Sequence, residues 1–257
     1  MSIDTRAVID PSAQIGENVS IGPFSIIGPN VEIGSDTWIG PHVVINGPTR
    51  IGKENRIFQF SSIGDIPQDK KYHGESSRLE IGDRNTIREF SSINRGTDDG
   101  GGVTVIGDDN WMMAYIHVAH DCQVGSNTIF ANAASIAGHV KVGDYAILGA
   151  FTAVHQFVSI GKHAFTGLGT ILSKDIPPFI IVNGNPAHAH GLNTEGLKRR
   201  GFSSEDINSI RQAYKTFYRS GLTVDEAAKQ LQDQHPQSAH VLEMVEFIMN
   251  SERGITR

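Results

Sequence analysis

An isoleucine occupies every sixth position over the first 63 residues of this chain, and this period restricts the fold more than any other feature. The run has no gap: Ile3, Ile9, Ile15, Ile21, Ile27, Ile33, Ile39, Ile45, Ile51, Ile57 and Ile63. A period of six does not fit an α-helix, but it fits a short strand that ends in a tight bend. Three such strands close a triangular coil of eighteen residues, so the repeat predicts a parallel β-helix.

In such a fold, the hydrogen bonds between stacked coils satisfy the backbone N–H and C=O groups. Each strand pairs with the strands one coil above and one coil below, roughly 4.8 Å away. The isoleucines then form apolar columns along the axis. One coil cannot bury its own apolar face, so many coils are needed for stability.

The repeat is interrupted twice. It stops after Ile63, resumes in phase at Ile81, breaks again after Ile93, and restarts one residue out of phase at Ile106. We therefore predict loops at residues 64–78 and 95–105. Insertions in solenoids usually lie on a functional face, so we expect both loops to contribute to a site.

A change of pattern near residue 175 divides the chain. The third run of the repeat extends to Leu172, with Thr166 as its polar exception. We predict a β-helix over residues 1–185 and a C-terminal helical domain over residues 186–257. The fold class is therefore mainly β, with a C-terminal α-helical domain.

Helix-start signals define this C-terminal domain. A short helix is expected from Asn193 to Gly201. Ser203 with Asp206, and Thr223 with the glutamate three residues later, have the spacing of capping boxes. A last helix is expected over about residues 238–252, with its apolar side chains on one face.

Composition excludes several classes of function. The formal net charge is −6, which does not favour nucleic-acid binding or a polybasic membrane surface. The single cysteine, Cys122, rules out an internal disulfide framework, and we expect it to be a small buried apolar residue. We find neither a signal peptide nor an integral membrane segment, so we expect a cytoplasmic protein.

Histidines gather on successive coils of the predicted β-helix. Residues eighteen apart stack, so His120 lies over Gly138, and Asp121 lies over His139. His155 follows on the next coil beside Gln156, and His117 precedes His120 by three residues. We therefore expect these histidines and the carboxylate of Asp121 to share one edge of the prism.

Two chemistries suit this cluster. A histidine can transfer protons near neutral pH, and a neighbouring carboxylate can fix its tautomer. A backbone N–H at the neighbouring glycine could meet a developing oxyanion. Alternatively, three histidines could hold Zn²⁺ with one open position, and the spacing alone leaves both readings open.

Several motifs resemble those of one enzyme family. HVAHDC at 117–122, IAGHV at 136–140, TAVHQF at 152–157 and NTEGLKRRGFS at 193–203 are similar to the acyl-carrier-protein–UDP-N-acetylglucosamine O-acyltransferases of lipid A biosynthesis. QDKKYHGE at 68–75 and the closing GITR extend the likeness along nearly the whole chain. The resemblance implies a left-handed coil.

The resemblance also implies roles for individual residues. His120 matches the general base that takes the proton of the sugar 3-hydroxyl, and Asp121 matches the residue that holds it. Gly138 matches the glycine whose N–H meets the thioester oxygen. The implied substrate-binding residues are Gln68, Asp69, Lys71, His117, His139, His155, Gln156, Asn193, Glu195, Arg199 and Arg200.

Partners follow from the same resemblance. It implies an acyl donor carried on the phosphopantetheine of acyl carrier protein, UDP-N-acetylglucosamine as acceptor, and a homotrimer with its sites between neighbouring prisms. It implies neither a metal nor a dissociable cofactor.

One position departs from part of the family. Members that use long acyl chains have a glycine where this chain has Leu168. We therefore expect a preference for a shorter donor, such as 3-hydroxydecanoyl or hydroxydodecanoyl.

Three other functions compete with this reading. One is a related hexapeptide acyltransferase: either the N-acyltransferase of the same pathway, which would need an additional N-terminal domain, or a sugar acetyltransferase that uses coenzyme A. The second is a zinc carbonic anhydrase. The third is a non-enzymatic scaffold, which would need neither the histidine cluster nor the two polar loops.

Overall fold

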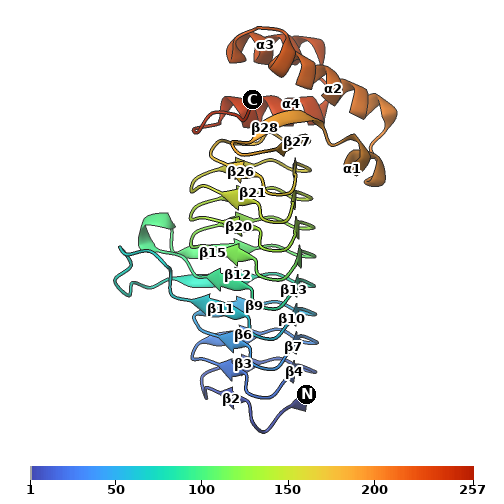
Figure 1. The fold of residues 1–257 in the computed structure, drawn as a ribbon. Coiled ribbons are helices and arrows are strands. Elements are labelled where there is room, and N and C mark those ends of the chain that lie inside the picture. Colours follow the sequence, from blue (N-terminus) through green and yellow to red (C-terminus); the bar gives the residue numbers. More distant parts are fainter. Residues whose placement is uncertain (1) are drawn as a thin grey trace.

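The computed structural model describes residues 2–257 as a triangular β-helix, here called the prism, with helices at its C-terminal end (Figure 1). Each coil gives one short strand to each of three parallel sheets, which we number in chain order. The predicted parallel β-helix followed by helices is therefore confirmed.

Strand bounds follow the six-residue repeat closely. The first sheet contains β1 (Ser2–Ile3), β4 (Ser20–Ile21), β7 (Trp38–Ile39), β10 (Arg56–Ile57), β13 (Thr86–Ile87), β16 (Trp111–Met112), β19 (Ile129–Phe130), β22 (Ile147–Leu148), β25 (Phe165–Thr166), β27 (Ile180–Asn183) and β28 (His188–Leu192). The second sheet contains β2 (Val8–Ile9), β5 (Ile26–Ile27), β8 (Val44–Ile45), β11 (Ser62–Asp65), β14 (Ser92–Asn94), β17 (His117–Val118), β20 (Ser135–Ile136), β23 (Ala153–Val154) and β26 (Ile171–Leu172). The third sheet contains β3 (Gln14–Ile15), β6 (Val31–Ile33), β9 (Thr49–Ile51), β12 (Arg78–Ile81), β15 (Val103–Ile106), β18 (Gln123–Val124), β21 (Lys141–Val142) and β24 (Ser159–Ile160).

Three edges separate these sheets. We call the edge between the first and second sheets the first edge, that between the second and third sheets the second edge, and that between the third and first sheets the third edge. Each edge is a column of tight turns, one turn per coil, except that two long loops replace turns of the second edge.

The repeat residues fill the prism. Ile57 pairs with Ile87, which pairs in turn with Met112, so apolar side chains stay in register across both insertions. Thr166, the polar exception, is also buried. Its Oγ1 accepts a hydrogen bond from Gly149 N at 2.9 Å and lies 2.7 Å from Thr152 Oγ1, so its hydroxyl is satisfied inside the core.

Both insertions leave the prism as loops on the same side (Figure 1). The strands extend further than predicted, because β12 pairs with β15 over four residues. The first loop therefore covers 66–77 rather than 64–78, and the second covers 95–102 rather than 95–105. The second loop contains a short 3-10 helix, η1 (Asp98–Gly100).

The prism ends in an antiparallel pair. β28 runs antiparallel to β27 and extends the first sheet, so residues 188–192 continue the sheet. Four helices follow: α1 (Thr194–Arg199), α2 (Ser204–Arg219), α3 (Val224–Gln234) and α4 (Ala239–Met249). Both predicted capping boxes are present, at Ser203 with Asp206 and at Thr223 with Glu226.

Two further expectations concern the chain as a whole. Cys122 is buried, and burial raises the pKa of its thiol to about 12, which fits an unreactive apolar residue. Within residues 2–257, no helix combines the length and the apolar character that crossing a membrane would require.

Candidate active site

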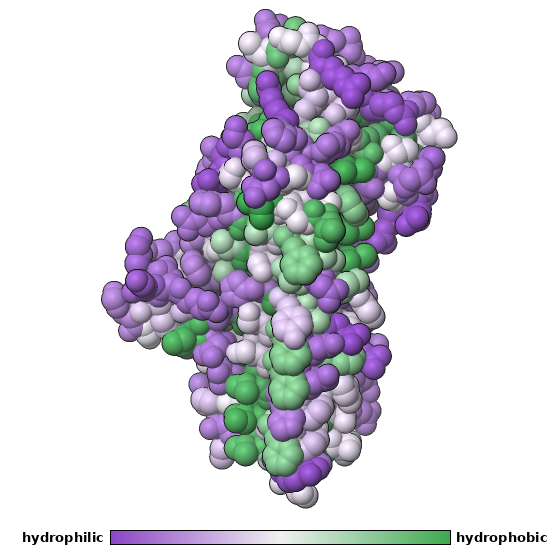
Figure 2. All heavy atoms as spheres, viewed as in Figure 1, coloured by the Kyte–Doolittle hydropathy of each residue, from purple (hydrophilic) through white to green (hydrophobic). Residues whose placement is uncertain are grey.

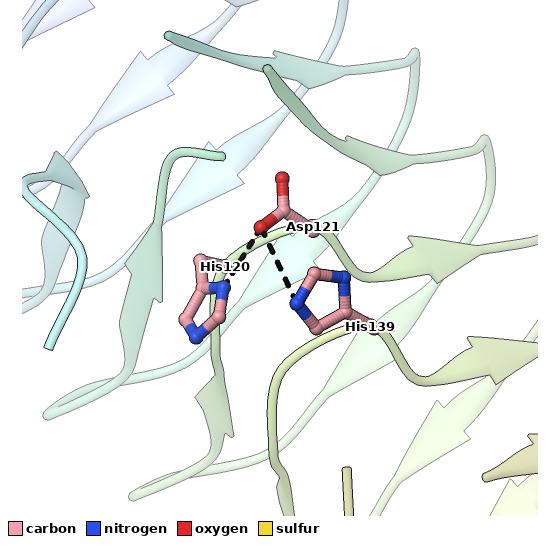
Figure 3. Close-up of side chains that lie close together, drawn as sticks. All are labelled: His120, Asp121 and His139. Atoms are coloured by element: carbon pink, nitrogen blue, oxygen red, sulfur yellow. Dashed lines mark hydrogen bonds and ion pairs between the residues drawn. The ribbon is translucent and has the colours of Figure 1, made fainter. Parts of the chain in front are cut away.

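A histidine–aspartate pair lies on the second edge, in the turn between β17 and β18. His120 Nδ1 lies 2.8 Å from Asp121 Oδ2 (Figure 3). An ionised carboxylate can only accept, so Nδ1 carries the proton and Nε2 keeps its lone pair. The side chain of Asp121 is fully buried, whereas that of His120 is 14% exposed. The His120 ring therefore reaches the surface while the carboxylate that holds it stays buried.

The second loop encloses the Asp121 carboxylate. Thr97 N donates to Oδ1 at 2.8 Å, and Thr97 Oγ1 donates to Oδ2 at 2.6 Å. Burial raises the pKa of Asp121, but the hydrogen bonds from His120 and Thr97 outweigh this effect, so its pKa lies below the ordinary value. Asp121 is therefore charged at neutral pH and ready to hold an imidazolium.

Glycine is required beside both members of the pair. A Cβ on Gly138 would lie 2.5 Å from Cε1 and 2.7 Å from Nε2 of His120. A Cβ on Gly100 would overlap the Asp121 carboxyl group. The backbone of Gly138 thus lies against the ring, and its N–H donates to no other atom of residues 2–257. That N–H is free to meet a ligand beside Nε2.

A groove of about 610 Å³ opens in front of His120 on the second sheet. It brings together the first loop, the strand-borne His117 and the turn at 156. The predicted site residues that line it are Gln68, Asp69, Lys71, His117, His120, Gly138 and Gln156. A cavity of about 640 Å³ between the third sheet and α4 is a weaker candidate, because its Lys162 and Glu243 pair with each other at 3.1 Å.

The remaining histidines have different surroundings. His117 Nδ1 lies 2.7 Å from Ser92 Oγ, and burial, together with the nearby His120, lowers the pKa of His117. His139 stacks on Phe157 with ring centroids 4.4 Å apart, and its Nε2 lies 3.9 Å from Asp121 Oδ2 (Figure 3). His139 faces a second cavity behind Asp121, and burial lowers its pKa. His155 is exposed next to Gln156, outside the groove lining.

Four predicted substrate-binding residues, which the family resemblance places at the nucleotide and its phosphates, lie on another edge: Asn193, Glu195, Arg199 and Arg200. Asn193 caps α1: its Oδ1 accepts from Gly196 N at 3.1 Å, and its Nδ2 donates to His163 O at 2.9 Å. Arg200 stacks over Tyr145, which belongs to the third edge, with its guanidinium carbon 4.4 Å from the ring centroid. Glu195 and Arg199 are exposed, and Glu195 pairs with Lys198 at 2.9 Å. One copy of the chain therefore does not bring these residues to the groove.

Leu168 lies on the first edge, in the turn between β25 and β26. Its side chain is 71% exposed. This exposed side chain is therefore free to meet a ligand or another chain.

The sequence reading missed Thr97, Ser92 and Phe157. Thr97 has the strongest claim to a role, because it makes two of the hydrogen bonds that hold Asp121. Thr97 lies in the second interruption of the repeat, which the sequence predicts to be a loop that contributes to the site. The sequence does not show, however, which residue of that polar loop turns back to the edge.

Comparison with known proteins decides the family. The chain is 56% identical over 256 residues to the acyl-carrier-protein–UDP-N-acetylglucosamine O-acyltransferase of Thiobacillus denitrificans, covering 100% of this chain and 99% of that protein. It is 58% identical over 259 residues to that of Janthinobacterium sp. (strain Marseille), with 99% of each covered. The chain belongs to this acyltransferase family.

Solved structures and a family model agree with this assignment. The UDP-N-acetylglucosamine O-acyltransferase of Moraxella catarrhalis superposes with a TM-score of 0.98 at 43% identity, covering 100% of both chains. The Acinetobacter baumannii enzyme gives a TM-score of 0.97 at 45% identity, covering 99% of both chains. Residues 175–256 match the second-domain model of UDP-N-acetylglucosamine O-acyltransferases. The family predicted from the motifs is therefore confirmed.

One set of ligand atoms raises the metal alternative again. A nitrogen of His120, a nitrogen of His139 and an oxygen of Asp121 lie within 4.8 Å of one another. However, the 2.8 Å contact between His120 and Asp121 is a direct hydrogen bond between two atoms that would otherwise face an ion. Thr97 also occupies both carboxylate oxygens. The geometry of the His120–Asp121 pair therefore favours proton transfer over metal binding in this acyltransferase.

Proposed function

We propose that this protein transfers a 3-hydroxyacyl group from acyl carrier protein to the 3-hydroxyl of UDP-N-acetylglucosamine, the first step of lipid A biosynthesis. The observation that carries this proposal is the His120–Asp121 pair, with its unprotonated ring nitrogen beside Gly138 in an open groove. Family membership supplies the class of donor and acceptor.

The chemistry uses side chains and one backbone donor. Nε2 of His120 takes the proton as the sugar 3-oxygen forms its bond to the thioester carbonyl carbon. The carbonyl oxygen becomes an oxyanion, which accepts a hydrogen bond from Gly138 N–H. When the carbon–sulfur bond breaks, the imidazolium returns the proton to the phosphopantetheine thiolate. Asp121 stabilises the imidazolium between these steps.

The groove lining suits the two substrates. Asp69 and Lys71, on the first loop, offer a carboxylate and a cation to the sugar and to phosphopantetheine, with Gln68 beside them. His117 offers a further polar atom on the sugar side, and Gln156 offers one on the nucleotide side. In this account His139 acts by supporting Asp121, and His155 meets the acyl donor at the rim.

A second copy completes the site. Arg199 and Arg200, at the end of α1, suit a diphosphate, and Asn193 and Glu195 lie at the start of the same short helix, but all four belong to the third edge of their own prism. A closed homotrimer brings the third edge of one copy to the second edge of the next and stops growing at three. The sugar nucleotide then binds between two prisms.

Leu168 is proposed to limit the length of the acyl tail. We expect the parent protein to prefer a 3-hydroxydecanoyl or hydroxydodecanoyl donor over hydroxymyristoyl, and Leu168→Gly to relax this preference. Each methylene kept from burial forfeits about 0.8 kcal/mol, so two or three correspond to a selectivity of roughly tenfold or more. Relative rates across a donor series measure the effect.

A volume-conserving variant serves as the control for this position. Leu168→Met changes the side chain with little change in volume, so the preference should stay within a few-fold of the parent. If the parent already favours the longest donor, Leu168 does not limit the tail.

The direct test of the function is a transfer assay. Purified protein is incubated with UDP-N-acetylglucosamine and 3-hydroxyacyl carrier proteins, and the product is located by mass spectrometry and NMR. Acylation at the sugar 3-oxygen supports the proposal. Transfer only to an amino sugar or only from coenzyme A would move the protein to another acyltransferase class, and carbonic anhydrase activity with stoichiometric zinc would refute the mechanism.

A further inference from the structure

The first loop reaches the groove without an apolar core of its own. It contributes Gln68, Asp69 and Lys71 to the groove lining. Figure 2 shows the two loops as a mostly hydrophilic projection from the prism, and Ile66, at the start of the first loop, is 52% exposed. Burial of apolar surface therefore contributes little to the position of this loop, which depends on polar contacts instead.

Arg95, at the start of the second loop, attaches the first loop to the prism. Its Nη1 donates to Gly47 O at 2.8 Å and to Gly64 O at 3.2 Å. Its Nη2 donates to Tyr72 Oη at 3.2 Å, and Tyr72 Oη donates in turn to Glu75 O at 3.2 Å. One side chain thus joins the middle of the first loop to two backbone carbonyls of the prism.

The same part of the second loop holds the point where the first loop leaves the prism. The register of β11 against β14 shifts at Gly64, whose φ is 72°. A bulge of this kind bends the strand and redirects the chain that follows it. Arg95 N donates to Asp65 O at 3.2 Å, and Asn94 Nδ2 donates to Ile66 O at 2.8 Å. These contacts fix the direction in which the first loop starts.

This segment also reaches the Asp121 carboxylate. Two residues after Arg95, Thr97 donates to both carboxylate oxygens, one from its N and one from its Oγ1. A Cβ on Gly96 would lie 2.7 Å from Asp121 Oδ1, so the backbone between these two residues packs directly against the carboxylate. Residues 94–97 therefore contact the first loop at one end and the buried carboxylate at the other.

We propose that residues 94–97 are a positioning segment for the transfer reaction, in which Arg95 orients the substrate-binding first loop and Thr97 orients Asp121. This inference rests on the proposed function and gives the second loop a role in it. Arg95 acts through the groove residues of the first loop, and Thr97 acts through Asp121, so both are positioning residues rather than catalytic ones.

The shape of the guanidinium, more than its charge, suits this role. Within residues 2–257, the side chain of Arg95 donates to three oxygens, and all three are neutral. A planar fork of N–H groups can reach acceptors on both sides at once, whereas a lysine ammonium offers a single nitrogen. Arg95→Lys should therefore behave like the loss of the side chain, although it keeps the positive charge.

Hydrogen–deuterium exchange tests the role of Arg95 without an activity assay. Arg95→Met should speed exchange of the backbone amides in residues 66–77 roughly tenfold or more, the effect of losing one charge-assisted hydrogen bond. Arg95→Lys should not restore the parent rate. Arg50→Met changes an exposed arginine on the third sheet and should leave exchange in the first loop unchanged.

Steady-state kinetics separate the two ends of the segment. Arg95→Met should raise KM for both substrates roughly tenfold and keep kcat within a few-fold, because the first loop loses its place while Asp121 keeps its donors. Thr97→Val should lower kcat roughly tenfold with KM nearly unchanged, since it removes one donor to the carboxylate. Thr97→Ser keeps the hydroxyl and should restore kcat.

Several outcomes would overturn the inference. Parent-like exchange in residues 66–77 of Arg95→Met would show that Arg95 does not hold the loop. Equal changes of kcat and KM at positions 95 and 97, together with a lower unfolding temperature, would show a segment that only supports the fold.

A milder variant covers the case in which Arg95→Met does not fold. Tyr72→Phe removes one acceptor of Arg95 and should speed exchange in the first loop by a smaller factor, and an unchanged rate would again overturn the inference. If Arg95→Met releases the loop but the parent protein transfers no acyl group, the attachment of the loop stands and the proposed function fails.

Discussion

His120→Ala should lower kcat by roughly 10²–10⁴-fold, the usual contribution of a positioned general base. The ring lies outside the apolar columns of the prism and is held by one hydrogen bond, to Asp121. Its loss should therefore leave the fold and the assembly unchanged. Turnover at saturating donor and acceptor, with thermal unfolding and light scattering on the same sample, measures both expectations.

A matched histidine provides the control for this variant. His190 is exposed on β28, away from the groove, so His190→Ala should keep the parent rate. If His120→Ala stays within a few-fold of the parent, another residue must accept the proton, and the assignment of His120 is wrong.

Asp121→Asn should have the second-largest effect, a loss on the order of 10²-fold or more in kcat, because the carboxylate fixes the histidine tautomer and stabilises the imidazolium. The amide offers one acceptor oxygen where Thr97 and His120 now donate three hydrogen bonds to two oxygens. Its NH2 group must then face a donor, and the favoured response is a His120 ring protonated on Nε2. That ring cannot act as a base.

Kinetics across pH separate this role from a structural one. A protein that merely lost packing would keep the shape of the parent pH–rate profile, whereas a changed tautomer and a missing negative charge should change the profile as well as the maximum rate. Asp98→Asn, an exposed carboxylate in the same loop, should leave both unchanged. A parent-like profile and rate for Asp121→Asn would contradict the account.

Most of the fold could be predicted from the six-residue period. It predicted the strand positions, the register of the isoleucine columns and the one-residue phase change at Ile106, because in a β-helix the spacing along the chain is the spacing in space. It also predicted that His120 lies over Gly138 and Asp121 over His139, and the structure has both neighbours.

Loops and chain ends were harder to predict, since the period does not extend into them. The second loop folds back to present Thr97 to Asp121, and no repeat fixes that path. β28 reverses direction and joins the first sheet by backbone hydrogen bonds that its sequence, HAHGL, does not signal. The column of stacked rings along the first edge could have been predicted, because Phe24, His42 and Phe60 recur at the eighteen-residue spacing of one coil.

The central claim is that one active site is built from two copies, with His120 on one wall and the two arginines on the other. Arg200→Ala should weaken binding of UDP-N-acetylglucosamine by roughly tenfold or more, because a charge-assisted hydrogen bond contributes about 1.5–3 kcal/mol. Calorimetry measures this affinity, and the double change of Arg199 and Arg200 to alanine should reduce activity further at low substrate.

Mixed trimers test this claim most directly. At a low concentration of UDP-N-acetylglucosamine, where sites without the two arginines are nearly empty, co-expressed, differently tagged His120→Ala and Arg199→Ala/Arg200→Ala chains should recover about a quarter of the parent rate, since each site takes one wall from each of two copies in a closed ring. A mixture of His120→Ala and Asp121→Asn chains, both altered on the same wall, should recover nothing. Equal activity for the two mixtures, or none for the first, would contradict a site shared between copies.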